Sequence, residues 1–155
     1  MPGNIFQGAF AAVAVSAAQD VFEITAPATH IVDIREVRLG QYSDPGDAAA
    51  ELLSVQIVRG HTTPGSGGAA LPLYALQGAG APASGVEANN TTVASNGVAK
   101  TMLADAFAVQ SGWRYRPPAD ERIQIQPGER AVIRISAPAD PLTMNGTLVL
   151  EEHRL

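Results

Sequence analysis

Side chains able to do chemistry are few in this sequence and lie far apart. The three histidines are His30, His61 and His153; none forms an H-x-H or H-x-x-x-H pair, and none has a carboxylate at ligand spacing. The chain has no cysteine, which excludes thiolate catalysis and cysteine-ligated zinc. A small cupin-like metal enzyme needs paired histidines on one strand plus a carboxylate. We therefore expect no catalytic residue, no metal, no cofactor and no enzymatic activity.

Two further motifs are better interpreted as loops or turns than as ligand-binding sites. The glycine-rich stretch at residues 60–68 lacks the lysine and following serine or threonine of a phosphate-binding loop, so we interpret it as a flexible loop. Asp44 and Asp47 flank Gly46 like a fragment of a calcium loop, but the remaining oxygen ligands are missing. We expect an ordinary turn at residues 43–46 and a short helical turn at residues 47–52.

Composition limits the class of partner. The chain has 155 residues, with 10 Lys and Arg against 15 Asp and Glu, for a formal net charge of −5. This balance argues against a phosphate backbone as the main partner, so we expect no nucleic-acid binding. Nine of the basic residues are arginines. Arginine suits bidentate pairing with carboxylates across a subunit interface, but isolated strand arginines such as Arg38 and Arg134 are more simply interpreted as solvated.

The N-terminal segment is alanine-rich and apolar from Ala9 to Ala18. No basic residue precedes it, since the first is Arg35, so it lacks the charged start of a signal peptide. It is also much shorter than the roughly 20 residues that span a bilayer, and we expect no membrane association. We interpret residues 1–18 as an N-terminal arm or first strand, and residues 19–155 as a single domain.

Alternating apolar residues predict strands in the first half of the domain. Residues 21–25 place Phe22 and Ile24 on one face, and residues 30–41 form a second alternating run. In this second run the apolar phase slips near Arg35 and Glu36, which predicts a β-bulge there. Residues 53–59 form a third strand.

Two long, apolar-poor stretches interrupt this pattern, at residues 60–72 and 77–97. They are rich in glycine, alanine, serine and asparagine, which predicts long loops or extended arms. Long loops in a compact domain are usually functional or packed on a partner.

The second half of the domain again alternates. Residues 100–109 favour a strand over a helix, and Trp113 and Tyr115 point one way until Pro117 ends their strand. A proline-glycine turn at residues 126–129 separates two alternating runs, at 123–125 and 131–135, which predicts a hairpin. Asn145-Gly146 predicts a turn before a final strand at residues 147–152.

These strands and their turns are typical of an all-β fold. About eight strands with no sustained helical period predict an antiparallel β-sandwich of jelly-roll type, with long loops and an extended N-terminal arm. Such sandwiches protect their sheet edges by packing two sheets or by oligomerising.

A few aromatic residues are candidate contact residues. Trp113 and Tyr115 lie on one strand face, where they form either part of the core or a platform for stacking sugars. Phe6 and Phe10, in the N-terminal arm, are candidates for contact with a partner chain.

Several segments together resemble small structural proteins of tailed bacteriophage virions. They are the alanine-rich arm, FEITAPATHIVDIREVRLGQYSD, GHTTPGSGG, NNTTVASNGVAKTMLADAFAVQSGWRYRPPADERIQI and RISAPADPLTMNGTLVLEEH. The nearest type is the head decoration or cement protein. The resemblance implies a β-sandwich displayed as a symmetric oligomer on the capsid, with the capsid surface as partner, no cofactor and no enzymatic activity.

The first hypothesis is therefore a virion structural protein, made in the host cytoplasm and located on the capsid surface. It would be a homo-oligomer, with a trimer favoured, and would contact the major capsid protein or other virion proteins through residues 2–18 and 77–97. The alternative is a carbohydrate- or receptor-binding module of a phage fibre or tail, using Trp113, Tyr115 and the loop that begins at Gly60.

Overall fold

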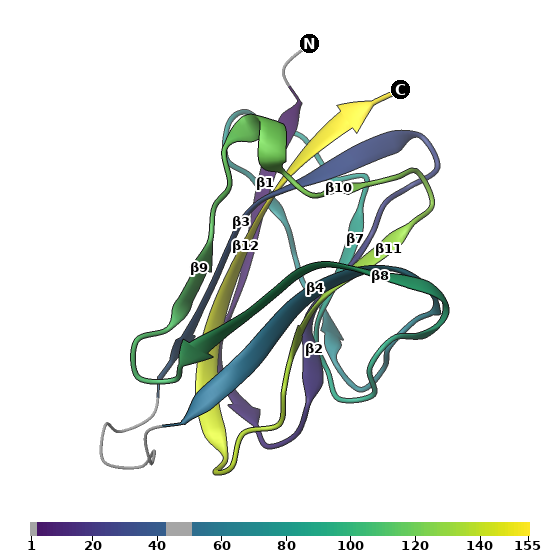
Figure 1. Ribbon diagram of the computed structural model, residues 1–155. Helices are drawn as coiled ribbons and strands as arrows, with labels where there is room; N and C mark the ends of the chain where they lie inside the picture. Colours follow the sequence, from purple (N-terminus) through teal and green to yellow (C-terminus); the bar gives the residue numbers. More distant parts are fainter. Residues whose placement is uncertain (1–2, 43–50) are drawn as a thin grey trace.

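The computed structural model describes residues 3–42 and 51–155 as two antiparallel β-sheets packed face to face (Figure 1). This confirms the predicted β-sandwich. Its elements are β1 Asn4–Val15, β2 Gln19–Thr25, β3 His30–Gln41, β4 Leu52–Thr63, β5 Ala69–Ala70, β6 Tyr74–Ala75, β7 Gly85–Asn90, β8 Ser95–Ala108, β9 Trp113–Tyr115, the 3₁₀-helix η1 Ala119–Glu121, β10 Gln124–Ile125, β11 Arg130–Ile135 and β12 Leu142–Arg154. In these two ranges no helix is long and apolar enough to cross a membrane.

The turns predicted near Asp44 and Asp47 fall largely on residues 43–50, outside the described residues. The predicted strand at residues 30–41 coincides with β3, and the predicted strand at 100–109 forms the second half of β8.

The strand order is that of a jelly roll. Sheet A has the order β10-β3-β12-β1-β6, with β9 also paired to β3, and sheet B has the order β5-β7-β2-β11-β4-β8. In chain order the pairs are nested: β1 with β12, β2 with β11, β3 with β9 and β10, and β4 with β8. A long antiparallel hairpin rolled on itself gives this nesting and brings β3 against β12 and β4 against β11.

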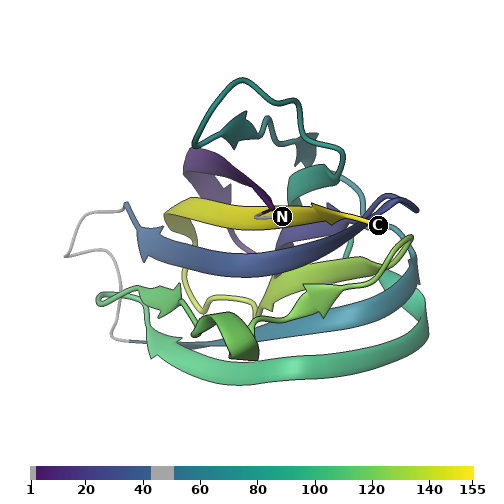
Figure 2. The same ribbon diagram turned by 90° about the horizontal axis from the view of Figure 1, so that it is seen from above.

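The chain between β4 and β8 extends both sheets at one edge of the sandwich. β7 joins β2 and β5 joins β7 in sheet B, whereas β6 joins β1 in sheet A. Figure 2 shows this excursion arching over the edge beside β1. Buried Glu152 anchors the loop between β6 and β7, because its carboxylate accepts hydrogen bonds from the backbone N–H groups of Ala83 at 3.0 Å and Ser84 at 2.8 Å, and from the Ser84 hydroxyl.

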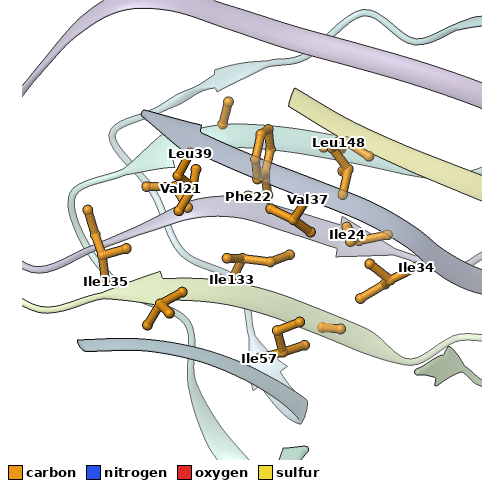
Figure 3. Packing of buried hydrophobic residues seen from close by; sticks show 14 of the residues in the cluster. Val21, Phe22, Ile24, Ile34, Val37, Leu39, Ile57, Ile133, Ile135 and Leu148 are labelled. Atoms are coloured by element: carbon orange, nitrogen blue, oxygen red, sulfur yellow. The ribbon is translucent and has the colours of Figure 1, made fainter. Parts of the chain in front are cut away.

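The bulge predicted in β3 is confirmed. Ile34 lies opposite Leu150 and Glu36 lies opposite Val149, so Arg35 is the extra residue. The bulge restores the inward phase, and Ile34, Val37 and Leu39 all remain in the core. Figure 3 shows these side chains meeting Phe22 and Ile24 of β2, Ile57 of β4, and Ile133 and Ile135 of β11 between the two sheets.

The prediction of a turn at Asn145-Gly146 was wrong, because both residues lie inside β12. Gly146 is needed for packing rather than for chain reversal. A Cβ atom there would lie 2.4 Å from the Phe10 ring and 3.1 Å from the Phe22 ring, which pack against each other with centroids 5.3 Å apart.

The predicted hairpin around residues 126–129 was also wrong. The turn itself is present, with the Glu129 N–H donating to the Gln126 carbonyl at 2.9 Å and Gly128 at φ +75°. However, β10 pairs with β3 in sheet A, whereas β11 pairs with β2 and β4 in sheet B. Two alternating runs joined by a tight turn identify two core-facing strands, but in a sandwich those strands can belong to opposite sheets.

The segment predicted as an N-terminal arm or first strand contains a strand, and so do the two stretches predicted as long loops or extended arms. Residues 4–15 do not extend away from the domain but form β1, which pairs with β12 along most of its length. The stretch at 60–72 includes the end of β4 and all of β5, and the stretch at 77–97 includes β7 and the start of β8. These strands are rich in small and polar residues, so they lack the alternation of large apolar and polar side chains from which strands are predicted.

Candidate functional site

The aromatic residues predicted to contact a partner are packing residues in this chain. Phe6, Phe10 and Trp113 are 0%, 9% and 8% exposed and belong to the core, and half-buried Tyr115 packs against it. Phe6 and Phe10 point inward because they occupy the core-facing positions of β1. The structure therefore leaves none of the four as an exposed platform.

Trp113, which stacks on Tyr115 within β9, joins the edges of the two sheets. Their rings stack with centroids 6.2 Å apart and an interplanar angle of 14°, and the indole Nε1 donates to Asp105 Oδ2 of β8 at 2.9 Å. This hydrogen bond, with a second from the Ala106 N–H, lowers the pKa of Asp105. Burial raises the pKa of the Tyr115 phenol. The Asp105 carboxylate thus accepts a hydrogen bond from the Ala106 N–H on the edge strand β8. A charged side chain at an edge strand commonly prevents that edge from pairing with another sheet.

The outer face of sheet B is covered by its own loops over β2 and β11, whereas its edge strand β8 is exposed. Arg134 donates to both oxygens of Asp20, at 2.6 and 3.1 Å, and to the Ala94 carbonyl at 2.8 Å, while the Ala94 N–H donates back to Asp20 at 2.7 Å. Asp20 is fully buried as a result. The interpretation of Arg134 as a solvated strand arginine was therefore wrong, and its bidentate partner lies within the chain. Val58, Ala94 and Val132 form a small second core under this loop.

A second buried carboxylate on the same face holds the glycine-rich loop. Glu23 accepts hydrogen bonds from the Gly65 N–H at 2.8 Å and from Asn90 Nδ2 at 3.1 Å, and its other oxygen lies 2.8 Å from Arg130 Nε. A Cβ atom on Gly65 would lie 2.7 Å from the Thr92 carbonyl oxygen. The loop backbone thus binds an anion, as glycine-rich loops do, but the anion is a side chain of this protein.

The outer face of sheet A is different. Its outward side chains on β1, β3 and β12 are mostly small or polar and remain partly or fully exposed, among them Gln7, Ala9, Arg38, Asn145 and Thr147. Tyr74 of β6 and Leu76, the residue after this strand, are 71% and 52% exposed. Exposed apolar side chains also occur on sheet B, at Leu52 of β4 and at Val98 and Met102 of β8, so they do not by themselves distinguish the two faces.

A groove of about 370 Å³ crosses this face from β6 to the segment around η1. Ile5 and Val149 line it together with Leu76, and on the far side it is lined by Arg35, Arg116 and Arg122, with Pro117 and Pro118. We call this feature the sheet A groove. Its lining combines apolar side chains with three guanidinium groups, and also includes Gln7 and Glu36.

The arginines of this face differ in how they are paired. Arg35 and Arg122 both donate to Glu151 Oε2, at 2.6 and 2.8 Å. Arg38 and Arg114 share Glu36 Oε1, at 3.2 and 2.9 Å. Arg116 is exposed and forms no ion pair with any residue of the described ranges.

The structure keeps the three histidines apart but gives one of them carboxylate neighbours. His30 contacts the Thr29 hydroxyl at 2.9 Å and His61 contacts the Asn96 carbonyl at 3.3 Å. His153, however, lies 3.3 Å from Asp33 and 3.9 Å from Glu151. The expectation that no histidine has a carboxylate at ligand spacing was therefore wrong. The signal was the spacing of Glu151 and His153, since residues two apart on a strand share a face.

Comparison with known proteins does not identify a family. No family model and no curated protein matches the sequence. Among solved structures, the chain is similar to one from maize chlorotic mottle virus, at 10% identity over 98% of this chain and 95% of that one, with a TM-score of 0.25. A chain from infectious bursal disease virus is similar at 10% identity over 99% of this chain and 41% of that one, with a TM-score of 0.14. At these TM-scores neither similarity bears on function.

Proposed function

We propose that this chain is a non-enzymatic structural subunit of a virion, most specifically a decoration or cement protein on the head of a tailed bacteriophage. Two observations support the class: the resemblance of its sequence segments to such proteins, and the jelly-roll strand order. Jelly rolls occur in viral shell, lectin and cupin domains, so the fold alone does not distinguish these classes. The residues at the surface must distinguish them.

The observation that carries the proposal is the difference between the two outer faces. Sheet B buries Asp20 and Glu23 under its own loops, whereas sheet A presents the sheet A groove and Arg116, which has no ion-pair partner among the described residues. A partner segment that inserts an apolar side chain between Ile5 and Val149 and places a carboxylate on Arg116 would complement this groove. We assign that segment to the shell protein.

The buried carboxylates support a structural rather than a catalytic role. Asp20, Glu23 and Glu152 are each 4% exposed or less. Each accepts hydrogen bonds from loop backbone, at Ala94, Gly65 and Ser84 respectively. Carboxylates committed in this way hold the fold together and have no free position for acid or base chemistry.

The geometry does not favour the carbohydrate-binding alternative. Trp113 is buried and its Nε1 is committed to Asp105, while Gly60 lies beside Val98, near the other end of β8. Asp105 lies seven positions after Val98 on β8, which is about 23 Å at roughly 3.3 Å per residue. The predicted sugar site would thus be divided between two distant places.

Binding to virion heads that lack this protein tests the proposal. We expect the wild-type protein to bind as a symmetric oligomer, measured by light scattering and by occupancy in electron cryo-microscopy. Arg116→Glu should abolish binding, whereas the matched charge reversal Lys100→Glu, on the exposed edge of sheet B, should retain it. Retained binding by Arg116→Glu, or no binding by the wild type, would contradict the proposal. A glycan-array signal lost in Trp113→Ala would favour the alternative.

A further inference from the structure

Three potential metal ligands meet at the end of sheet A where the chain termini lie (Figure 1). Asp33 on β3 is directly opposite Glu151 on β12, and His153 follows two residues later on the same strand face. One ligand atom from each lies within 4.8 Å of the others. The chain thus brings one imidazole and two carboxylates, from positions 118 residues apart, to a single point.

The Asp33 carboxylate is incompletely satisfied. The residue is 5% exposed, and Oδ1 has no hydrogen-bond partner in the described part of the chain. Its Oδ2 has one contact, with His153 Nε2 at 3.3 Å. A buried carboxylate with so few donors carries a desolvation cost that a bound cation would offset.

The spacing and chemistry of the donors indicate the kind of cation. Ligand bonds of 2.0–2.2 Å in a tetrahedral site place ligand atoms about 3.4 Å apart. His153 Nε2 lies 3.3 Å from Asp33 Oδ2 and 3.9 Å from Glu151 Oε1, which is close to that spacing. Imidazole with carboxylates suits Zn²⁺ and similar transition metals, whereas Mg²⁺ and Ca²⁺ prefer all-oxygen sites.

Groups around the ligands hold Glu151 in place. Arg35 and Arg122 bind its Oε2 and leave Oε1 on the side of His153. The Gly3 N–H donates to Oε1 at 3.2 Å, and a Cβ on Gly3 would lie 2.8 Å or less from Glu151 and His153. The two guanidinium groups already balance the two carboxylates, so we expect micromolar rather than nanomolar affinity.

We propose that Asp33, Glu151 and His153 bind one Zn²⁺ per chain, with water completing the coordination. The ion joins the ends of β3 and β12 beneath the first residues of β1. It is a structural site, and it stands independently of the proposed virion role because the isolated protein suffices to test it.

Calorimetric titration of the full chain, stripped with a chelator, with Zn²⁺ tests the proposal. We expect one site per chain and a rise in the melting temperature. His153→Gln and Asp33→Asn should each weaken binding at least tenfold, whereas the matched variant His61→Gln should bind like the wild type, and Mg²⁺ should not bind. Because His153 is partly exposed, His153→Gln should fold normally, which circular dichroism checks.

Three results would overturn the site: no Zn²⁺ binding by the wild type, equal binding by a folded His153→Gln variant, or loss of binding in His61→Gln instead.

Discussion

The two outer faces of this sandwich carry similar residues but use them differently. On sheet B, arginine and carboxylate pairs are buried under loops from the same chain, as Arg134 and Asp20 show. On sheet A, pairs such as Arg38 and Glu36 remain at the surface, and Arg38 is half exposed. These two pairs therefore differ in role: the pair of Arg134 and Asp20 secures a loop, and the pair of Arg38 and Glu36 lies at an open surface.

The largest expected difference between the faces concerns these pairs. Arg134→Ala leaves fully buried Asp20 without its guanidinium, and breaking a buried pair from one side costs about 3–5 kcal/mol of unfolding free energy. The matched variant Arg38→Ala removes a surface pair and should cost less than about 1 kcal/mol. Urea denaturation of both variants measures the difference, and equal costs would show that the two faces are energetically alike.

Two glycine substitutions compare the packing of the glycine-rich loop on sheet B with that of β3 on sheet A. Gly65→Ala forces a Cβ to 2.7 Å from the Thr92 carbonyl and 2.9 Å from Glu23 Oε2, which should cost about 1–3 kcal/mol. At Gly40 of β3 a Cβ meets nothing within 4 Å, so Gly40→Ala should be neutral or stabilise the strand by about 0.5 kcal/mol. Thermal melting ranks the two variants, and a larger loss for Gly40→Ala would contradict this account of the two faces.

The smallest expected effect is a pH dependence where the sheet edges meet. The pKa of Asp105 is lowered in the folded state, first by the hydrogen bond from Trp113. Its contribution to stability is therefore fully present above its ordinary value of 3.8 and is lost as the pH falls through the lowered pKa. The wild type should be more stable than Asp105→Asn at neutral pH, and their melting temperatures should converge in acid. A difference that stays constant across this range would show that the hydrogen bond does not depend on the carboxylate's charge.

Strand positions were predictable from the sequence where large apolar residues alternate. The bounds of β3 and its bulge at Arg35 follow from the phase of Ile34, Val37 and Leu39. The alternation of apolar residues along a strand shows which of its two faces is buried, because this depends on the side chains of that strand alone. It does not report the hydrogen-bond partner, which is why the runs around residues 126–129 were assigned to one hairpin although they belong to opposite sheets.

The surface was much less predictable. Arg134 and Arg38 look alike in the sequence, and only the loop that ends at Ala94 distinguishes them. The cluster of Asp33 with Glu151 and His153 depends on the register between β3 and β12, which joins the start and the end of the domain. The spacing of Glu151 and His153 places these two on one strand face, but only the topology brings Asp33 to them.

The central claim is that the outer face of sheet A is the face that contacts the shell. Hydrogen–deuterium exchange, compared between the free protein and the protein bound to heads, tests it most directly. We predict slower exchange at residues 74–76 and 114–122, which border the sheet A groove, and no change at residues 64–68 and 91–94 on sheet B. Protection of the sheet B loops with an unchanged groove would contradict the claim.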